Sequence, residues 1–491
     1  MTTPLAVFRA DASPSIGGGH VARCLALAEA LAEAGWRTAL ATRAGTEDTV
    51  PAAAQLPRIT LPDVAIANEP EALARALPDV CALLVVDHYG WTDAEERASR
   101  RFAHRIAVLD DLAAAPHDAE IVLDPTPGRN AAAYSGWVRP GTTVLPGAAW
   151  APLRSAIVAA RVPRERRALR RVLVSMGMTD PGNATGRVLA ALAAGGFTGD
   201  IDVVLGAAAP HRAAIGSMLP PRATLHIDPP DLPAVIARAD LAIGAGGVSA
   251  LERGCLGVPS LLIEIADNQR AAIAGLVAAG AAQSLGPLAA LDDPAITSAV
   301  HALAADGTAL ASLSRAALRL CDGLGARRAG TWLAPERSRD GAPVSLRPAG
   351  SEDEAMLLSW QSAPGVRAYA RNPAVPTPCE HNAWLAATLA HPSRILSIIT
   401  CGGKPAAMLR LDWLGDADSQ EVSIVVSPEH QRQGIGVAAL ALARRLLPHA
   451  RLVAEVNPGN AASVALFNAA GFRCKGGARW EHHRASEPVS T

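Results

Sequence analysis

Short apolar runs alternate with segments of helical periodicity over the first 330 residues of the chain. Runs of four apolar residues occur at 5–8, 83–86 and 106–109, and a helical pattern covers 21–34. This rhythm is typical of βαβ units, in which helices cover both faces of a parallel sheet. It predicts two doubly wound domains, with strands at 5–8, 39–41, 83–86, 106–109, 121–123, 172–175, 201–204, 241–243 and 260–263.

Two breaks interrupt this rhythm. The arginine-rich stretch 164–171 predicts a solvated helix between domains rather than a binding patch. The polar segment 335–343 contains proline and glycine and predicts a linker. Beyond it, strand patterns at 408–411 and 422–426 and a helical pattern at 436–447 predict an α+β domain. The predicted fold class is α/β, with Rossmann-like domains at 1–150 and 151–334, a linker at 335–343 and an α+β domain at 344–491.

Charge and composition narrow the classes of function. The 491 residues include 45 Lys and Arg against 46 Asp and Glu, a net charge of −1, and no basic strip suited to nucleic acid. No apolar run approaches the roughly 20 residues of a membrane span, and the first residues lack the pattern of a secretory signal. We therefore expect a cytoplasmic protein. The 7 cysteines never form C-x-x-C, and the histidines at 482 and 483 lack further ligands, so no disulfide framework and no metal is expected.

A glycine-rich segment follows the first predicted strand. It reads R-A-D-A-S-P-S-I-G-G-G-H-V-A-R-C over 9–24 and leads into the first helix. Glycines permit a tight turn, and the amides at a helix start attract a phosphate or another anionic group. His20 stands at that helix start, where the positive helix end favours the neutral imidazole that a general base requires. The competing interpretation is a histidine that only caps the helix.

A second glycine turn between a strand and a helix lies at 243–253. Gly246, Gly247 and Ser249 are spaced to hold a diphosphate on backbone amides, and Glu252 to accept hydrogen bonds from two ribose hydroxyls. This spacing is typical of a nucleotide-sugar site, and the alternative is a purely structural turn. Polar segments at 175–180 and 267–269, after neighbouring strands, favour the nucleotide-sugar interpretation.

Several further motifs occur in register with these two turns. They are R-A-D-A-S-x-x-I-G-x-G-H-x-x-R-C at 9–24, V-D-H-Y at 86–89, D-D-L at 110–112, D-x-x-x-G-R-like at 124–129, S-x-G-x-T-D-P at 175–181, E-R-x-C-L-G-x-P-S at 252–260, A-D-N-Q at 266–269 and D-G-x-G-A at 322–326. With these motifs, residues 5 to about 332 resemble the UDP-sugar hydrolases of pseudaminic acid biosynthesis. The resemblance implies the GT-B fold of two Rossmann-like domains that this family shares with MurG-type glycosyltransferases.

This resemblance also implies a reaction and a set of site residues. The reaction is hydrolysis of UDP-2,4-diacetamido-2,4,6-trideoxy-β-L-altropyranose to UDP and the free sugar, with inversion at the anomeric carbon and with His20 activating the water. Met178 stands where the family often has a glycine. The implied substrate contacts are Asp11, Gly17, Gly19, Arg23, Asp87, His88, Tyr89, Thr179, Gly246, Gly247, Ser249, Glu252, Asp267, Asn268 and Gln269.

A third glycine loop lies in the last predicted domain, where a strand at 422–426 runs through Q-R-Q-G-I-G into a helix. The free amides at that helix start can bind a pyrophosphate. This loop resembles the acetyl-CoA loop of the GNAT acetyltransferases, and the segments 455–463 and 466–472 resemble the strand and helix that follow it in that family. The resemblance covers about 344–484 and implies acetyl-CoA as co-substrate. The implied contacts are Val426, Gln431, Arg432, Gln433, Gly434, Gly436, Asn457, Asn460 and Ser463.

The candidate catalytic residues of this last domain depart from the usual GNAT pattern. GNAT enzymes often have a tyrosine as the acid in their last helix, but Phe467 stands there, and Phe467 cannot donate a proton. Tyr369, a water or another group must then protonate the thiolate of CoA as it leaves. Glu421, just before the predicted strand, is a candidate base, or else a solvated glutamate at a strand edge. The segment 360–373 is a candidate acceptor site, with Trp360 and Trp384 as ordinary core residues in the competing interpretation.

These inferences combine into a bifunctional enzyme, a UDP-sugar hydrolase fused to an N-acetyltransferase that acetylates the 4-amino group of the precursor sugar nucleotide. Three alternatives stay open. The first is a GT-B glycosyltransferase that uses an acceptor other than water. The second is a sugar-nucleotide sensor without turnover, and the third is the same hydrolase with a GNAT domain that acts on another amine. The sequence leaves the oligomeric state open.

Overall fold

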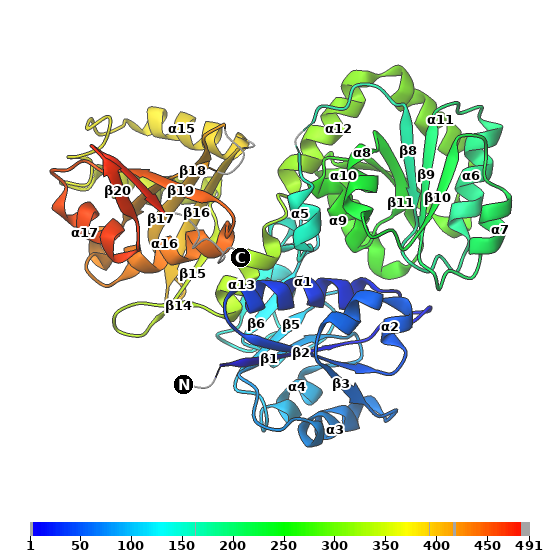
Figure 1. Cartoon of the computed structure of the whole chain (residues 1–491), viewed down its shortest axis with the longest axis horizontal. Coiled ribbons are helices and arrows are strands. Elements are labelled where there is room, and N and C mark those ends of the chain that lie inside the picture. The colour runs from blue at the N-terminus through cyan, green and yellow to red at the C-terminus, as the bar shows by residue number, and fades with distance from the viewer. Residues whose placement is uncertain (1–2, 163, 392, 416–418, 483–491) are drawn as a thin grey trace, which may run out of the picture. The chain divides into compact units, whose positions relative to one another are not determined.

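The computed structural model describes residues 3–162, 164–391, 393–415 and 419–482. The chain forms two compact units, Met1–Ala329 and Gly330–Thr491. The first unit contains two parallel sheets and the second contains one mixed sheet (Figure 1). Within the described residues, no helix is both long enough and apolar enough to cross a bilayer.

The first sheet is parallel and has the strand order of a Rossmann fold. Its central strands are continuous apolar runs because helices cover both faces; Trp91 and Leu73, for example, pack in the core on the side of α3 and α4. The helices are α1 (Gly19–Glu33), α2 (Thr46–Thr49), α3 (Glu69–Ala76) and α4 (Asp93–Ser99). In spatial order the strands are β3 (Arg58–Leu61), β2 (Arg37–Arg43), β1 (Leu5–Ala10), β4 (Leu83–Asp87), β5 (Ile106–Leu109), β6 (Ile121–Asp124) and β7 (Thr143–Pro146).

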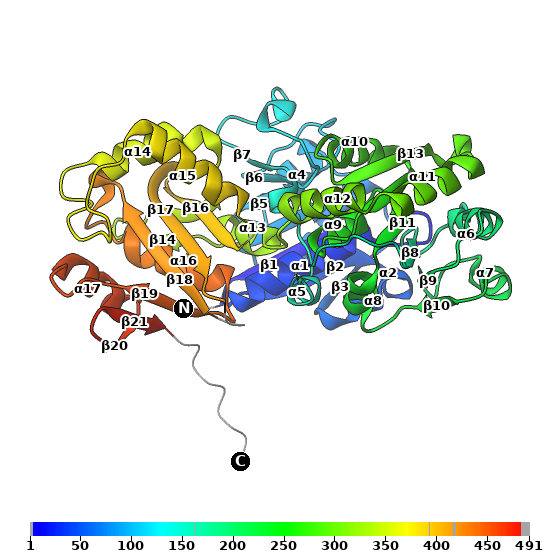
Figure 2. The ribbon, with the colours of Figure 1, turned by 90° about the horizontal axis from the view of Figure 1, so that it is seen from above.

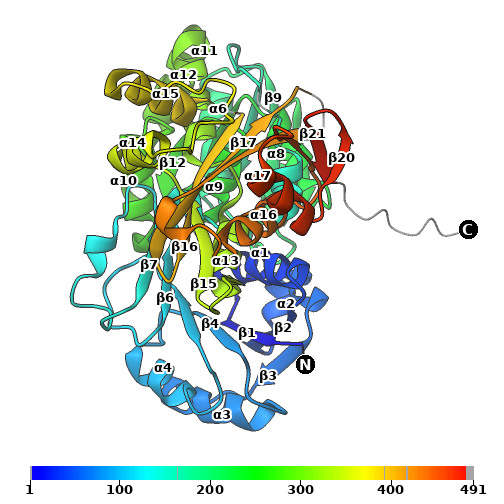
Figure 3. The same ribbon diagram turned by 90° about the vertical axis from the view of Figure 1, so that its left-hand side faces the viewer.

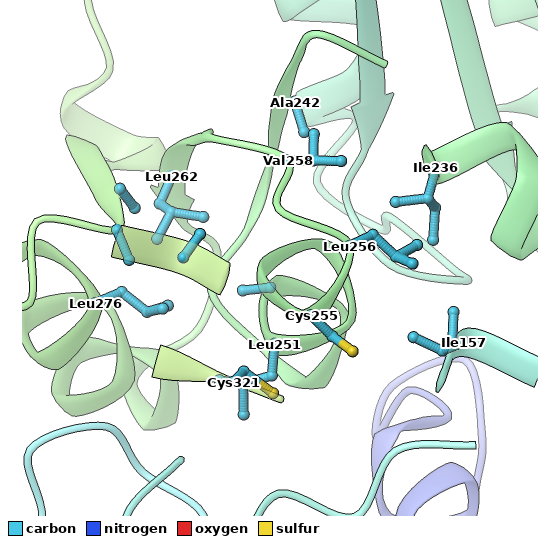
Figure 4. Close-up of a cluster of buried hydrophobic side chains, with 14 of the residues drawn as sticks. Ile157, Ile236, Ala242, Leu251, Cys255, Leu256, Val258, Leu262, Leu276 and Cys321 are labelled. Carbon is cyan, nitrogen blue, oxygen red and sulfur yellow. The ribbon is translucent and has the colours of Figure 1, made fainter. Parts of the chain in front are cut away.

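The second sheet repeats this plan. Figure 1 shows α6 and α11 on one side of it and α8 and α9 on the other, and Figure 2 gives the same helices from above. Figure 4 shows the core on the α9 side, where Leu251, Leu262 and Leu276 pack together. The strands in spatial order are β10 (Ala223–Ile227), β9 (Asp200–Leu205), β8 (Arg171–Ser175), β11 (Leu241–Ala245), β12 (Ser260–Glu264) and β13 (Ala282–Pro287). The helices are α5 (Ser155–Ala159), α6 (Ala184–Ala194), α7 (Arg212–Ser217), α8 (Leu232–Arg238), α9 (Val248–Cys255), α10 (Arg270–Ala278), α11 (Asp293–Ala305) and α12 (Gly307–Leu320).

The arginine run before β8 is not the solvated helix that its composition predicts. Residues 164–170 have an irregular backbone, and the Arg166 side chain is buried. Its guanidinium donates hydrogen bonds to the carbonyl oxygens of Ala239 (2.9 Å), Gly257 (2.7 Å) and Ala237 (3.0 Å). Burial lowers its pKa to about 10. The prediction was wrong because this arginine stabilises the ends of neighbouring elements instead of facing water.

The sheet of the second unit is mixed. Neighbouring strands are antiparallel except β18 and β19, which are parallel. Helices α14 and α15 cover one face and α16 lies on the other (Figure 3). In spatial order the strands are β14 (Glu336–Arg337), β15 (Pro343–Pro348), β16 (Arg394–Cys401), β17 (Lys404–Trp413), β18 (Ser419–Val426), β19 (Arg451–Glu455), β21 (Arg479–His482) and β20 (Arg473–Gly476). The helices are α13 (Gly325–Leu333), which begins in the first unit, α14 (Glu354–Ser362), α15 (Pro378–Ala390), α16 (Ile435–Leu446) and α17 (Ala461–Ala469).

The segment 335–343, predicted to be a linker, contains β14, which pairs with the start of β15. The compact units divide slightly earlier, after Ala329. The boundary near 150 lies between β7 and β8, in a stretch that contains α5. Of the two histidines at 482 and 483, the one at 483 lies outside the described residues.

Candidate active sites

The first candidate site lies at the carboxyl ends of β1 and β4, where the strand order of the first sheet reverses. In open α/β sheets this is the position where ligands bind. The glycines at 17–19 bring the chain from β1 to the start of α1, so that His20 becomes the second residue of the helix. Its Nδ1 lies 2.5 Å from Oδ1 of Asp87, the last residue of β4. Two strands and a helix start thus bring a histidine and a carboxylate together.

Asp87 is a buried carboxylate held by two partners. Arg23, one turn after His20 on α1, donates from Nε to Oδ2 (2.5 Å) and from Nη2 to Oδ1 (2.7 Å). Burial alone would raise the pKa of Asp87, but the charges of Arg23 and His20 outweigh burial and lower it to about 2. An ionised carboxylate only accepts hydrogen bonds, so Nδ1 of His20 donates its proton to Asp87. With Nδ1 as the donor, Nε2 is the ring nitrogen that remains to accept a proton, as a general base must.

A tyrosine and an asparagine complete the surroundings of His20. The rings of Tyr89 and His20 meet edge to face, with centroids 4.7 Å apart. The Tyr89 hydroxyl donates to Oδ1 of Asp111 (2.8 Å) and accepts from Nδ2 of Asn268 (2.9 Å). Burial raises the pKa of Tyr89, and the Asp111 charge raises it further, so the phenol keeps its proton at neutral pH. Tyr89 and Asn268, 179 positions apart in the chain, are thus in direct contact.

Asp11 and His88 lie in a neighbouring polar network. The carboxylate of Asp11 accepts from Nη2 of Arg9 (2.7 Å), and Nε2 of His88 lies 3.6 Å from its Oδ2. Arg9 also donates to Glu69, at 2.8 and 2.9 Å, inside the protein. Burial lowers the pKa of His88, and the charge of Arg9 lowers it further, which favours the neutral ring. Arg9, expected to follow the first strand, lies within β1 and is fully buried.

The glycine loop of the first site packs against the second sheet domain of the same unit. Gly17 has φ +79°, a conformation that favours glycine, and its amide donates to the carbonyl of Ser13 (2.8 Å). A Cβ on Gly18 would lie 2.5 Å from Sδ of Met178, and one on Gly19 would lie 3.5 Å from Val248. Met178, where the resembling family often has glycine, therefore fills space against this loop.

The second glycine turn lies at the carboxyl end of β11, next to β8, where the second sheet also reverses its strand order. Gln269 accepts hydrogen bonds from the amides of Gly246 (3.2 Å) and Ile265 (3.3 Å). The hydroxyl of Ser249 accepts from Nη1 of Arg253 (3.1 Å). The carboxylate of Glu252, predicted to hold a ribose, is mostly buried and pairs with Nη2 of Arg154 (2.9 Å).

Two further predicted contacts of this domain differ in exposure. Thr179 is buried after β8, whereas the carboxylate of Asp267 is 93% exposed and pairs with Nη2 of Arg270 (2.7 Å). Asp180, next to Thr179, accepts the amides of Ala184 and Thr185 at 2.9 Å each and so fixes the start of α6. The turn after β8 is therefore held in place by its own carboxylate.

Gly246 also has a packing role that can be tested. A Cβ at this position would lie 2.3 Å from Cγ1 and 2.7 Å from Cδ1 of Ile273, whereas a Cβ on Gly247 would meet its nearest atom, Nε2 of Gln269, at 3.9 Å. We expect Gly246→Ala to lower the free energy of unfolding by roughly 1–3 kcal/mol through overpacking. Gly247→Ala is expected to change it by less than about 0.5 kcal/mol.

Thermal unfolding of the two variants measures this difference. The additional change Ile273→Val should recover part of the stability lost in Gly246→Ala. Equal melting temperatures for Gly246→Ala and Gly247→Ala would mean that the core around Ile273 accommodates a Cβ at position 246.

The second candidate site lies in the mixed sheet. β18 pairs with β19 only at residues 419–421, and both strands are fully described, so the edge of 422–426 that faces β19 lacks a strand partner there. Val426 ends this open edge, and the loop that follows leads into α16. Arg432 and Gly434 have φ +63° and +81°, and Gly434 precedes the first residue of α16. Gln431 and Arg432 are exposed, and a Cβ on Gly436 would lie 2.8 Å from Leu466.

The downstream residues of this site are partly engaged in local structure. Oδ1 of Asn457 accepts the amide of Gly459 (2.9 Å), and Oδ1 of Asn460 accepts the amide of Ser463 (3.0 Å) at the start of α17. Nε2 of Gln433 donates to the carbonyl of Glu429 (2.8 Å). These contacts fix the loops on both sides of the open edge.

Glu421 lies within β18, two residues after its start, rather than before the strand as predicted. Its carboxylate contacts Nη2 of Arg371, and Nε of Arg371 donates to Glu455 on β19 (2.8 Å). The Glu421 side chain is 17% exposed, against 54% for Glu455. The alternative interpretation of Glu421, a solvated glutamate, does not fit this side chain, which is a mostly buried member of an ion-pair cluster at the point where β18 and β19 separate.

Phe467 and Tyr369 are placed differently. The Phe467 ring is buried and meets Phe472 edge to face, with centroids 5.0 Å apart. Tyr369 is 49% exposed, and its Cε1 would lie 3.4 Å from a Cβ on Gly459. Tyr369 therefore stands next to the loop that follows β19. Trp384, by contrast, packs against the small core under α14 and α15, as does Trp360.

Two residues that join predicted site residues, Asp111 and Arg371, were not singled out from the sequence. Asp111 binds both Arg23 (Nη1 to Oδ2, 2.7 Å) and Tyr89, and Arg371 joins the two glutamates. Both positions lay within segments already singled out, the D-D-L motif and 360–373, but charge pairs across strands leave no spacing signal. Within the described residues no group of three or more His, Cys, Asp or Glu has the geometry of a metal site.

Comparisons with known proteins match separate parts of the chain. Residues 357–472 match the model of the Acetyltransferase (GNAT) family. The spore coat polysaccharide biosynthesis protein SpsG of Bacillus subtilis (strain 168) is 31% identical over 155 residues, which cover 30% of this chain and 46% of that protein. The match with this curated relative therefore spans less than half of the relative's length.

Solved structures are similar to the two parts separately. MurG of Acinetobacter baumannii is 16% identical and covers 67% of this chain and 99% of its own, with a TM-score of 0.49. The aminoglycoside acetyltransferase AAC(6′)-Ib in complex with coenzyme A is 20% identical and covers 29% of this chain and 95% of its own, with a TM-score of 0.26. The predicted α/β fold class is confirmed, because two Rossmann-type parallel sheets are followed by a mixed sheet, and residues 357–472 match the GNAT family model. The match with this acetyltransferase family supports the expected co-substrate, acetyl-CoA.

Proposed function

We propose, on the premise that residues 357–472 form a GNAT domain, that the chain is a bifunctional nucleotide-sugar enzyme. Its first unit hydrolyses a UDP-sugar to UDP and the free sugar, and its GNAT domain acetylates an amino group of the precursor UDP-sugar. By the resemblance of its motifs, the sugar is the 2,4-diacetamido-2,4,6-trideoxy sugar of pseudaminic acid biosynthesis. The polysaccharide-related name of the Bacillus relative supports a role in sugar metabolism.

The observation that carries the hydrolase half is the His20–Asp87 pair beside Tyr89 and Asn268. In the proposed step the oxygen of water attacks the anomeric carbon while Nε2 of His20 takes one proton of the water. The bond between that carbon and the phosphate oxygen breaks, and its electron pair leaves on UDP. A base in this position contributes roughly 10²–10⁴-fold to the rate. Tyr89 and Asn268 are proposed to contact the sugar.

The substrate's uridine diphosphate is proposed to lie at the second glycine turn. There Gly247 precedes α9, whose first amides can bind a diphosphate oxygen. Glu252 is proposed to bind the ribose. Its carboxylate pairs with Arg154, so it must accept the ribose hydroxyls either beside this ion pair or in place of it. The buried side chains of Asp11, Arg23 and Asp87 bond within the protein, which favours positioning roles over direct contact with the substrate.

The GNAT domain fits acetyl-CoA at the open edge of β18. Backbone groups of 422–426 on the side facing β19 lack strand partners there, and the first amides of α16 point toward the loop 431–434. Bound acetyl-CoA supplies the acetyl thioester. This chain's residues hold its pantetheine and pyrophosphate groups and place Glu421 near the amine, whose proton Glu421 removes directly or through water.

A test of both halves uses the purified full chain and the UDP-4-amino sugar, with products identified by mass spectrometry. With acetyl-CoA we expect CoA, UDP and the free diacetamido sugar. Without acetyl-CoA we expect no acetylated product. UDP release that requires a carbohydrate acceptor would indicate a glycosyltransferase. Acetyl transfer to unrelated amines but not to the UDP-sugar would overturn the proposed acceptor.

The role of Glu421 has its own prediction. We expect Glu421→Gln to lower kcat for acetyl transfer by about 10²-fold, because the amide cannot accept the proton, and to leave UDP release unchanged. Glu455→Gln removes the other carboxylate partner of Arg371 and serves as the matched control. Equal losses in both variants would assign Glu421 a purely structural role.

A further inference from the structure

A hairpin upstream of the GNAT match lies along α16. Residues 330–343 belong to the second unit and contain β14 and the turn to β15. Near the last turn of α16, Arg445 donates to the carbonyl oxygens of Ala334 (2.6 Å) and Gly330 (2.8 Å). The family match begins at 357, so this hairpin lies outside the matched residues but within the same compact unit.

The other end of the hairpin reaches the start of α16. The amide of Arg339 donates to the carbonyl of Gln433 (2.8 Å). A Cβ on Gly434 would lie 3.3 Å from the amide nitrogen and 3.7 Å from the Cβ of Arg339. The backbone of the turn is thereby fixed against the glycine loop, and the Arg339 side chain begins beside the residue that precedes α16.

The charge of Arg339 is uncompensated. Its side chain is exposed, and within the described part of the chain no ion pair or hydrogen bond of its guanidinium is found. The acidic neighbours on the hairpin are engaged elsewhere, since Asp340 contacts the Ser338 hydroxyl and Glu336 pairs with Arg445 (3.3 Å). The first amides of α16 add a positive partial charge at the same end of the helix.

We propose that Arg339 binds a phosphate group of CoA and so contributes to the affinity of the GNAT domain for its co-substrate. This proposal rests on the proposed acetyl-CoA site at the start of α16. A guanidinium that starts beside the pyrophosphate-binding loop forms charge-assisted hydrogen bonds with phosphate oxygens. The hairpin that precedes the residues matched by the family model thereby becomes part of the co-substrate site.

The test measures binding of CoA to the full chain by calorimetry, which needs no acceptor amine. We expect Arg339→Gln to raise the Kd for CoA about tenfold, the size of one charge-assisted hydrogen bond. Arg473→Gln removes the same charge from an exposed residue on β20, at the opposite edge of the sheet from β14, and should leave the Kd unchanged. The melting temperature of both variants should equal that of the parent protein.

A second measurement identifies the phosphate as the contact. Transfer of acetyl from S-acetylpantetheine, which has no phosphate, should have the same KM in Arg339→Gln as in the parent, while KM for acetyl-CoA rises about tenfold and kcat stays within about twofold. An unchanged Kd for CoA in Arg339→Gln, with normal binding by the parent, overturns the role of Arg339 alone. Absence of CoA binding by the parent overturns the proposed acetyltransferase site, and the role of Arg339 with it.

Discussion

Replacing His20 by glutamine is expected to lower the rate of UDP release by roughly 10²–10⁴-fold, the contribution of a general base. Glutamine is close to histidine in size and can still bond to Asp87, but it cannot take a proton from water near neutral pH. The loss should fall on kcat, because the proton moves only in the chemical step. The measurement is the steady-state rate of UDP formation from the diacetamido UDP-sugar.

A second histidine and aspartate pair provides the matched control. Nε2 of His226, on β10, lies 2.8 Å from Oδ1 of Asp202, but β10 is an outer strand of the second sheet and has no glycine loop. His226→Gln should leave UDP release within about twofold of the parent. Acetyl transfer should be unaffected in both variants. Full UDP release by His20→Gln would rule out His20 as the base and leave its side chain only the structural contact with Asp87.

The hydrophobic pattern predicted the inner strands of the first unit and missed the outer ones. Strands β3 and β7 are the edges of the first sheet, and β10 and β13 are the edges of the second. Each has a neighbour on one side only, and β10 has no fully buried residue, so its apolar run is broken by polar positions. The inner strands β4, β5 and β6 are buried throughout and were recognised by their apolar runs.

The mixed sheet was less predictable. β17 and β18 were found, but β16 (Arg394–Cys401) was missed although its centre is buried. Strands β14 and β15 form a short hairpin and belong to the same sheet. The polar composition of this hairpin is typical of a linker, so its first strand was not predicted. The two-residue strand β14 depends on its partner β15, which a local pattern does not contain.

The candidate site was predictable by residue type but not by role. Glycine loops and polar residues after strands predicted a site, and two of its predicted residues, Tyr89 and Asn268, are in contact across 179 positions of the chain. Whether a charged residue faces the substrate or a protein partner depends on side-chain geometry. Arg23 was expected to bind substrate, but its guanidinium is buried between Asp87 and Asp111.

Asp87→Asn is expected to have the largest combined effect on the first unit. The amide leaves the buried Arg23 without one of its two carboxylate partners, and breaking a buried ion pair costs roughly 3–5 kcal/mol of unfolding free energy. The substitution also removes the carboxylate that holds the proton on Nδ1 of His20. The corresponding change of aspartate to asparagine in a Ser-His-Asp triad lowers kcat about 10⁴-fold. Chemical unfolding and UDP release measure the two effects separately.

Asp111→Asn is the matched control, because it removes the other carboxylate from the same arginine at a position that is 21% exposed. We expect a smaller loss, roughly 1–2 kcal/mol, and a UDP-release rate that falls much less than in Asp87→Asn, since Asp111 does not touch His20. Equal rate losses in the two variants would mean that Asp87 acts only by holding Arg23.

The unfolding free energy measured against pH shows how much the charge of Asp87, rather than the size of its side chain, stabilises the fold. The folded pKa of about 2 lies below the ordinary value of 3.8, so Asp87 stabilises the fold above about pH 4, and this contribution is lost as the pH falls toward 2. The difference corresponds to roughly 2 kcal/mol. Asp87→Asn has no such group, so its unfolding free energy should fall less steeply between pH 4 and 2 than that of the parent. Parallel curves would show that Asp87 does not carry this titration.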